Sequence, residues 1–245
     1  MNCLICANEM TYVFSEEILK KYNVKYFHCG HCDMIKTEAP FWLKEAYASP
    51  INETDTGIIE RNLIFSKVVF SVFGGVFKKD EIFLDYAGGY GMLTRLMRNY
   101  GFNFLHSDPF TENIFAKGHQ YHGTEKITAM TCFECFEHLE NPTTEMEKML
   151  KISDTILFST TLFKKIPPRT WDYYGFEHGQ HISFYSKKTL SEMAKKYQLN
   201  FYTNGKNMHL FSKRKISRAC FTILTIVARF LMLVQFDFFF KKYER

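Results

Sequence analysis

Glu81-Ile-Phe-Leu-Asp-Tyr-Ala-Gly-Gly-Tyr-Gly91 is the stretch of sequence on which the fold of this chain depends. Its first half is apolar or aromatic around one acid, Asp85, and its second half is a run of small residues. Apolar side chains then recur from Met92 onward at the spacing of one helical face. A strand, a glycine turn and a helix in this order are typical of the opening of a nucleotide-binding βαβ unit. A glycine turn allows positive φ and close approach to a ligand, although on its own it can also be no more than a tight loop.

A second strand is expected at 102–106, and Asp108 follows it. Asp108 lies about 20 residues beyond the turn, where an acid that bonds ribose hydroxyls is expected. No third glycine follows Gly91 at the spacing of a pyrophosphate-binding turn, and no lysine follows as in a phosphate-binding Walker loop. These features favour a nucleoside ligand without a pyrophosphate over NAD or ATP.

The run Leu84-Asp-Tyr-Ala-Gly-Gly-Tyr-Gly91 resembles the first motif of class I S-adenosylmethionine (SAM)-dependent methyltransferases. Ala87 stands where that motif usually has its first glycine. The resemblance implies that Gly89 and Gly91 line the methionine end of SAM and that Asp108 holds the ribose. The cofactor-binding residues predicted in and after the turn are Asp85, Ala87, Gly88, Gly89, Gly91 and Asp108.

Phe133-Glu-Cys-Phe-Glu-His138 follows an expected strand at 127–133 and resembles the E-V-hydrophobic-E-H signature of the same group. An acid often found earlier in that strand is replaced here by Thr128. The resemblance implies that Phe133 and Glu134 contact SAM and that His138 is a catalytic candidate in the adjacent pocket. The alternative for His138 is a histidine at a helix start that bonds a neighbouring carbonyl.

The order of strands and helices predicts an α/β protein with the Rossmann-like, seven-stranded sheet of class I methyltransferases. A hairpin at 199–212 is expected to close the sheet. The predicted division is a zinc ribbon at 1–38, a helical cover segment at 39–78, a methyltransferase domain at 79–212 with an insertion loop at 164–186, and an apolar C-terminal helix at 213–245.

Two C-x-x-C pairs near the N-terminus predict a metal site. Each pair can present two thiolates to one ion, so together they can form a tetrahedral zinc site with no open coordination position. Such a site stabilises the fold and performs no chemistry. The alternatives are a reduced thiol cluster without metal and a redox pair. The predicted ligands are Cys3, Cys6, Cys29 and Cys32.

The cover segment contains a short helix at 40–47 and a longer one at about 57–76. The run 42–57, with Arg61 and Asn62, resembles a stretch of bacterial sugar- and glycan-modifying methyltransferases in which N-terminal helices cover the SAM pocket. The resemblance makes Tyr47, Asp55 and Arg61 candidate site residues, with Tyr47 and Arg61 assigned to substrate. Helix capping and surface charge are the alternative roles.

The insertion at 164–186 carries aromatic and titratable groups at the edge of the sheet where ligands bind. Trp171 and Tyr173 are predicted to stack on the apolar face of a sugar or to enclose the SAM sulfonium by cation–π contact. Gln180 is the remaining predicted substrate contact. It stands where sugar C-methyltransferases, which this loop resembles, have a glutamate, and the difference favours O-methylation.

Two histidines in this insertion, His178 and His181, have side chains suited to taking a proton from a hydroxyl acceptor near neutral pH. The predicted catalytic residues are therefore His181 as the general base, with His178 and His138. The alternative role of His181 is to bond backbone and shape the loop.

The apolar segment 216–240 is interrupted by Arg229 and Asp237, so it is not expected to span a membrane. Basic residues at both ends suit a helix lying on anionic lipid. A packed helix or a homodimer interface is the alternative.

Composition limits the remaining choices. A hydrophobic content of 46% and a charged content of 23% indicate a globular protein. Seven cysteines without a signal-like start favour free thiols or metal ligands over disulfides. The expected location is the cytoplasm, or the inner face of the membrane. A net charge of +5 does not require a nucleic-acid partner.

The function predicted from the sequence is SAM-dependent O-methylation of a sugar or glycan precursor of the bacterial cell surface. The alternatives are a zinc-ribbon RNA base methyltransferase, a sugar C-methyltransferase and a non-catalytic scaffold. The sequence after the fourth strand is Phe133-Glu-Cys-Phe, which differs from the Asn/Asp-Pro-Pro-aromatic motif of many amino-methylating enzymes and disfavours RNA bases.

Overall fold

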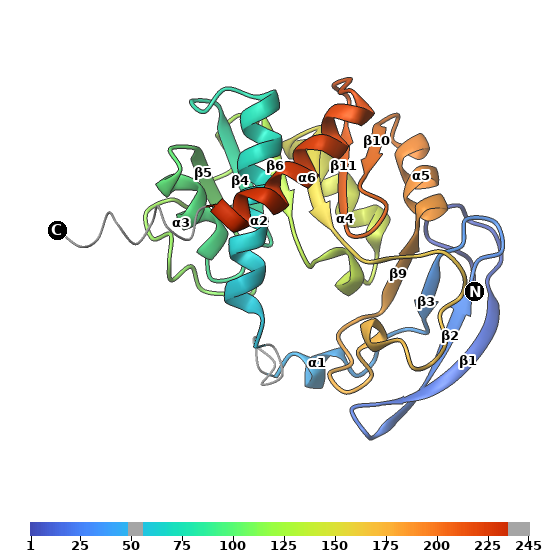
Figure 1. Cartoon of the computed structure of the whole chain (residues 1–245). Helices are drawn as coiled ribbons and strands as arrows, with labels where there is room; N and C mark the ends of the chain where they lie inside the picture. The colour runs from blue at the N-terminus through green and yellow to red at the C-terminus, as the bar shows by residue number, and fades with distance from the viewer. Residues whose placement is uncertain (49–55, 235–245) are drawn as a thin grey trace.

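The computed structural model describes residues 1–48 and 56–234, so the candidate Asp55 lies outside the described residues (Figure 1). Its centre is a six-stranded sheet in the order β10-β11-β7-β6-β4-β5. The four strands from β7 to β5 are parallel, whereas β11 runs antiparallel to β7 and to β10. The strands are β4 (Ile82–Tyr86), β5 (Asn103–Ser107), β6 (Ala129–Cys132), β7 (Thr155–Ser159), β10 (Asn200–Thr203) and β11 (Met208–Ser212).

The predicted seven-stranded sheet is therefore corrected to six strands among the described residues. A single parallel bridge between His106 and Gln120 lies on the outer side of β5. Gly118 (φ 82°) and Gly123 (φ 86°) take left-handed conformations on either side of Gln120. Because these conformations interrupt extended backbone, the pairing stops at one bridge.

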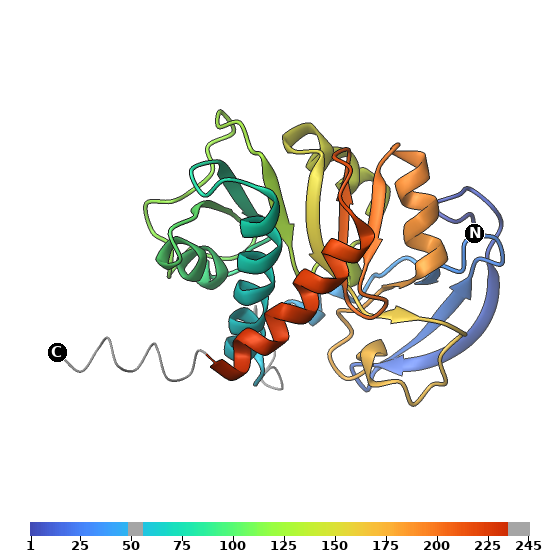
Figure 2. The same cartoon turned by 45° about the horizontal axis from the view of Figure 1, so that its top comes forward.

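Helices cover both faces of this sheet because its buried strands alternate their side chains between two cores. Phe83 packs with α2 (Ile58–Val76), α3 (Met92–Asn99) and α6 (Arg218–Val234) on one face. Leu84 packs with α4 (Pro142–Ile152) and α5 (Lys187–Lys196) on the other. Helices α2 and α6 lie side by side in both views (Figures 1 and 2).

The helices begin where the sequence supplies capping groups. The Asn141 side chain accepts a hydrogen bond from the Thr144 N–H at the start of α4, with Pro142 in the first turn. Ser186 and Thr189 form a reciprocal capping box at the start of α5. These caps fix the ends of the helices that follow the candidate site segments.

A second sheet joins the N-terminal ribbon to the insertion. Its order is β1-β2-β3-β9-β8. The ribbon strand β3 pairs with β9 of the insertion, with Ile35 opposite Phe184. The strands are β1 (Thr11–Ile18), β2 (Tyr22–His28), β3 (Ile35–Thr37), β8 (Leu162–Phe163) and β9 (Ser183–Ser186). The ribbon therefore holds one end of the insertion in place.

The C-terminal segment forms α6, which packs Phe221 and Ala228 into the core beside α2. Ile223, Ile226 and Val227 of the same helix are exposed. Within 1–48 and 56–234, no helix combines the length and hydrophobicity that crossing a bilayer requires. The part of the predicted helix from 235 to 240 lies outside the described residues.

Candidate active site

The turn between β4 and α3 has to be built from small residues, for two reasons. Gly91 has φ 83°, and a Cβ there would lie 2.5 Å from Oδ1 of Asn113. Gly88 has no room because its Cβ would lie 2.6 Å from Oδ2 of Asp85. Ala87, at the position of the usual glycine, has φ 54°, a conformation that L-residues adopt at a cost of about 1–2 kcal/mol. The turn thus keeps a shape that larger residues would not tolerate.

Asp85 supports this turn from the core side. Its buried carboxylate accepts hydrogen bonds from the hydroxyls of Thr131 (2.8 Å) and Thr94 (3.1 Å). Burial raises the pKa of Asp85 to about 6, although the threonine bonds and nearby His106 oppose the shift. Nε2 of His106 lies 2.8 Å from the Gly89 carbonyl. The structure thus places Asp85 beneath the turn, where it braces the glycines.

Asp108, the predicted ribose-binding residue, lies beside the turn and is bonded to it. Its Oδ2 accepts from the Gly89 N–H at 2.9 Å, and its Oδ1 accepts from the N–H groups of Phe110 and Thr111 at 2.8 Å. A carboxylate oxygen has two lone pairs, so Oδ2 retains one for a ligand hydroxyl. Beside Asp108 is an open cavity of about 510 Å³. Sequence reasoning missed several of its lining residues because no motif marks them: Thr111, Asn113, Lys117 and Gln120.

The end of β6 brings three predicted residues together. Glu134 has φ 47°, its N–H donates to Oγ of Ser159 at 2.7 Å, and that hydroxyl donates to Oε1 of Glu134 at 2.6 Å. Nε of Arg61 from α2 lies 4.0 Å from Oε2 of Glu134. The ring of Phe133 stacks on Phe65 of α2 at 4.4 Å between centroids. Helix α2 therefore covers the end of β6.

The three predicted catalytic histidines form one cluster, although they come from two segments. The ring of His181 lies 4.9 Å from that of His138 and 4.8 Å from that of His178. Nδ1 of His181 lies 2.6 Å from the Tyr173 carbonyl. Because a carbonyl can only accept, Nδ1 carries the proton and Nε2 of neutral His181 has a free lone pair. Burial lowers the pKa of His181 well below its usual range and that of His138 to about 4.

His138 and His178 are each held by other contacts. Nδ1 of His138 lies 3.1 Å from the Gln180 carbonyl and 2.9 Å from the Tyr47 hydroxyl. Nδ1 of His178 accepts from the Gln180 N–H at 3.1 Å, so its neutral form has the proton on Nε2. Because Nδ1 of His138, like that of His181, lies on a carbonyl, Nε2 is the acceptor nitrogen of both rings.

The predicted substrate residues differ in how they contact the histidine cluster. The Tyr173 ring packs on His181 at 4.7 Å, and its hydroxyl accepts from the Thr161 N–H. Gln180 donates from Nε2 to the Ala46 carbonyl at 2.8 Å, so its side-chain amide binds α1 (Leu43–Ala46) rather than a histidine. Trp171 packs among aromatic neighbours, with Tyr173 and Tyr174 at 5.1 Å, and remains partly accessible.

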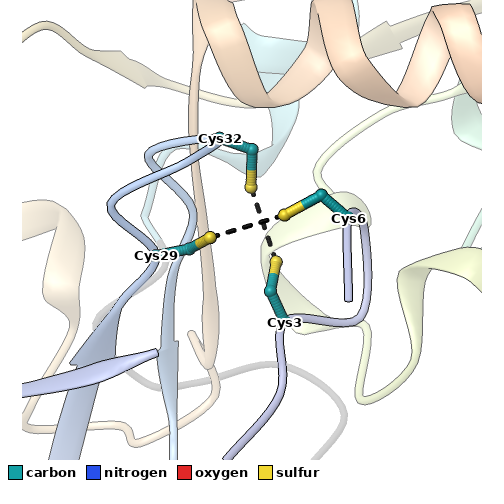
Figure 3. A group of neighbouring side chains, drawn as sticks. All are labelled: Cys3, Cys6, Cys29 and Cys32. Carbon is teal, nitrogen blue, oxygen red and sulfur yellow. Dashed lines mark hydrogen bonds between the residues drawn. The ribbon is translucent and has the colours of Figure 1, made fainter. Parts of the chain in front are cut away.

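The four N-terminal cysteines converge, as their spacing predicted (Figure 3). Their sulfurs lie within 4.8 Å of one another, with Cys3–Cys32 at 3.4 Å and Cys6–Cys29 at 3.5 Å. In each pair the residue after the second cysteine turns back in a left-handed conformation: Ala7 has φ 60° and Asp33 has φ 64°. The Cys32 carbonyl accepts from the Thr189 hydroxyl at 2.8 Å, which ties the cluster to α5.

Comparison with known proteins identifies the class. The chain is similar in structure to the Burkholderia thailandensis 1,6-didemethyltoxoflavin-N1-methyltransferase with bound S-adenosylhomocysteine, with TM-score 0.52, 12% identity and coverage of 81% of this chain and 97% of that one. It is also similar to the plantazolicin methyltransferase in complex with a substrate analogue and S-adenosylhomocysteine, with TM-score 0.50, 12% identity and coverage of 75% and 84%. At these identities the likeness shows the fold.

A family model described as "Methyltransferase domain" matches residues 60–204, which is more than half of the chain. The prediction of a SAM-dependent methyltransferase is therefore confirmed. The chain belongs to the methyltransferase-domain family. A search of the curated proteins finds no match.

Proposed function

We propose that this enzyme transfers a methyl group from SAM to a hydroxyl of a sugar or glycan precursor. The observation that carries the proposal is the position of the histidine cluster: His138 follows the end of β6, the same strand end at which Glu134 meets Arg61 of α2. Ligands of doubly wound sheets bind beyond these strand ends. A donor site and a proton acceptor therefore share one edge of the sheet.

The turn and Asp108 fit SAM. Gly89 and Gly91 present backbone without side chains, and Oδ2 of Asp108 can accept from a ribose hydroxyl. Phe133 and Glu134 are assigned to the same site from the end of β6, whereas Asp85, Ala87 and Gly88 maintain the turn. SAM would supply a sulfonium methyl group, which a hydroxyl oxygen attacks in line. The chain's task is to align this acceptor and to remove its proton.

We assign proton removal to Nε2 of His181, whose lone pair is free because Nδ1 is bound to the Tyr173 carbonyl. His138 and His178 line the same pocket. We assign sugar binding to the partly accessible rings of Trp171 and Tyr173, together with Tyr47 and Arg61. Gln180 contributes by positioning α1. Gln180, which bonds the Ala46 carbonyl, stands where the sugar C-methyltransferases that this loop resembles have a glutamate, so O-methylation is favoured over C-methylation.

We also propose that the four cysteines hold a structural zinc ion. A tetrahedral site with Zn–S bonds of about 2.3 Å places its sulfurs roughly 3.8 Å apart, and two of the observed pairs are slightly closer than this. The donor set leaves no position for substrate. The ion would therefore stabilise residues 1–38 as a ribbon. The ribbon precedes the cover segment (39–78), the methyltransferase domain (79–212) and the tail (213–245).

For the tail we propose peripheral contact with the inner face of a membrane. Ile223, Ile226 and Val227 are exposed on α6, and Lys213, Arg214 and Lys215 precede it. Exposed apolar residues next to basic ones suit an anionic lipid surface. A homodimer through the same face is the alternative.

The substrate class is tested by transfer of labelled methyl from SAM to nucleotide-sugars, lipid-linked glycans and ribosomal RNA. We expect label in a sugar-containing acceptor, stable to alkali as an ether is. Label confined to RNA, or alkali-labile label on a carboxyl group, would contradict the proposal. Boiled enzyme gives the background.

A further inference from the structure

The buried acid Glu137 lies next to the histidine cluster and has no role in the chemistry described above. Its side chain is fully buried, and neither carboxylate oxygen has a hydrogen-bond partner among the described residues. A buried carboxylate without a partner costs considerable free energy, so its retention points to a function. An oxygen of Glu137 and ring nitrogens of His138 and His181 all lie within 4.8 Å of one another.

Backbone contacts hold this acid and the base in fixed relative positions. The Ile182 N–H donates to the Glu137 carbonyl at 2.8 Å, and Nδ1 of His138 lies 3.1 Å from the Gln180 carbonyl. The Ser183 hydroxyl donates to the Leu139 carbonyl at 2.8 Å. The segment that carries Glu137 and the segment that carries His181 are therefore bound to each other on both sides of the pair.

A buried histidine base faces an electrostatic difficulty that this acid can relieve. Burial lowers the pKa of His181 because the imidazolium ion is poorly solvated there, and His138 and His178 lower it further. Proton transfer from a hydroxyl to Nε2 creates that cation. An ionised carboxylate within 4.8 Å stabilises the cation strongly, because the site has a low dielectric constant.

We propose that Glu137 is the positioning residue that stabilises the protonated form of His181 during methyl transfer. This inference rests on the proposed function. The proton leaves the acceptor hydroxyl for Nε2 of His181 as the oxygen–methyl bond forms and the sulfur–methyl bond breaks, and it later passes to solvent. Glu137 touches neither donor nor acceptor and acts through the imidazole.

The charge of Glu137 sets the pH dependence. Burial and, second, the nearby Glu134 raise its pKa to about 8, while the hydroxyls of Tyr173 and Thr160 oppose the shift. The other titratable groups around it are His138, His181, Tyr47 and Tyr185. Below about pH 8 Glu137 is protonated and cannot balance the imidazolium ion. Activity should therefore fall as the pH decreases through this value.

The test needs no substrate. The histidine side chains of the full-length protein are labelled with ¹³C, and their resonances are followed from pH 5 to pH 10 in the wild type and in Glu137→Gln, which preserves shape and removes the charge. We expect the His138 and His181 resonances to show an inflection near pH 8 in the wild type and none there in Glu137→Gln. The exposed neighbour Glu140 provides the control, because Glu140→Gln should retain the inflection.

Kinetics provide the second measurement once an acceptor is known. Glu137→Gln should lower the plateau of the kcat–pH profile by about 10- to 100-fold and leave SAM affinity unchanged. It should also move the acidic limb of that profile to lower pH, since His181 then titrates alone. Glu137→Asp should restore part of kcat. A purely structural role would not move the limb.

Two results would overturn the inference. One is a set of His138 and His181 titration curves that is the same in wild type and Glu137→Gln. The other is broadening of these resonances by equimolar Mn²⁺ in wild type only, which would show that the three groups hold a metal ion. Loss of SAM binding by the wild type would contradict the proposed function and leave the titration result intact, so the two failures are distinguishable.

Discussion

His181→Ala is expected to reduce kcat by about 10²- to 10⁴-fold while leaving SAM binding unchanged. Removal of a positioned general base has an effect of this size. The affinity for SAM should be retained because the turn, Asp108 and Glu134 are contributed by other segments. Single-turnover methyl transfer at saturating SAM, combined with calorimetric titration of SAM, measures the two quantities separately.

The matched control distinguishes a base from a residue that shapes the loop. In His181→Asn the amide N–H can take over the bond that Nδ1 makes to the Tyr173 carbonyl, whereas the proton-accepting Nε2 is absent. Both variants should therefore be equally slow. If His181→Asn retained wild-type turnover, His181 would serve only the structure of the loop.

The double substitution Cys29→Ser, Cys32→Ser is expected to remove the metal, unfold residues 1–38 and abolish methyl transfer. Metal binding in small Cys-rich sites contributes about 10–16 kcal/mol of apparent folding free energy, so such a ribbon does not form without it. Activity should be lost too because β3 pairs with β9, which begins two residues after His181. The measurements are metal content, limited proteolysis and methyl transfer.

Cys220→Ser is the appropriate control, because Cys220 is partly exposed on α6 and lies outside the cluster. It should retain metal, protease resistance and activity. A metal-free double variant whose first 38 residues still resist proteolysis would show that the cysteines are a thiol cluster without a structural ion.

Features of the site that depend on local sequence could be predicted. The glycine turn is determined by backbone conformation at Gly91 and packing at Gly88. Both requirements can be recognised in the sequence because glycine meets them. The cysteine pairs were visible because two short spacings define a tetrahedral donor set.

Features that depend on distant pairing could not be predicted. The pairing of β3 with β9 joins residues far apart in sequence, and no composition marks it. The absence of a seventh strand from the described part of the chain depends on the conformations of Gly118 and Gly123, which the sequence does not reveal. Within Phe133-Glu-Cys-Phe-Glu-His138 the two acids look alike, although Glu134 is exposed and Glu137 is fully buried.

Calorimetric titration of SAM into the full-length protein is the most direct test of the central claim, that the turn between β4 and α3 binds the methyl donor. The wild type should bind SAM at one site. Gly91→Val should not bind it, because φ is 83° there and a Cβ would lie 2.5 Å from Asn113. Circular dichroism of the variant checks that the fold survives. Absence of binding by the wild type, or equal affinity in a folded Gly91→Val, would contradict this account.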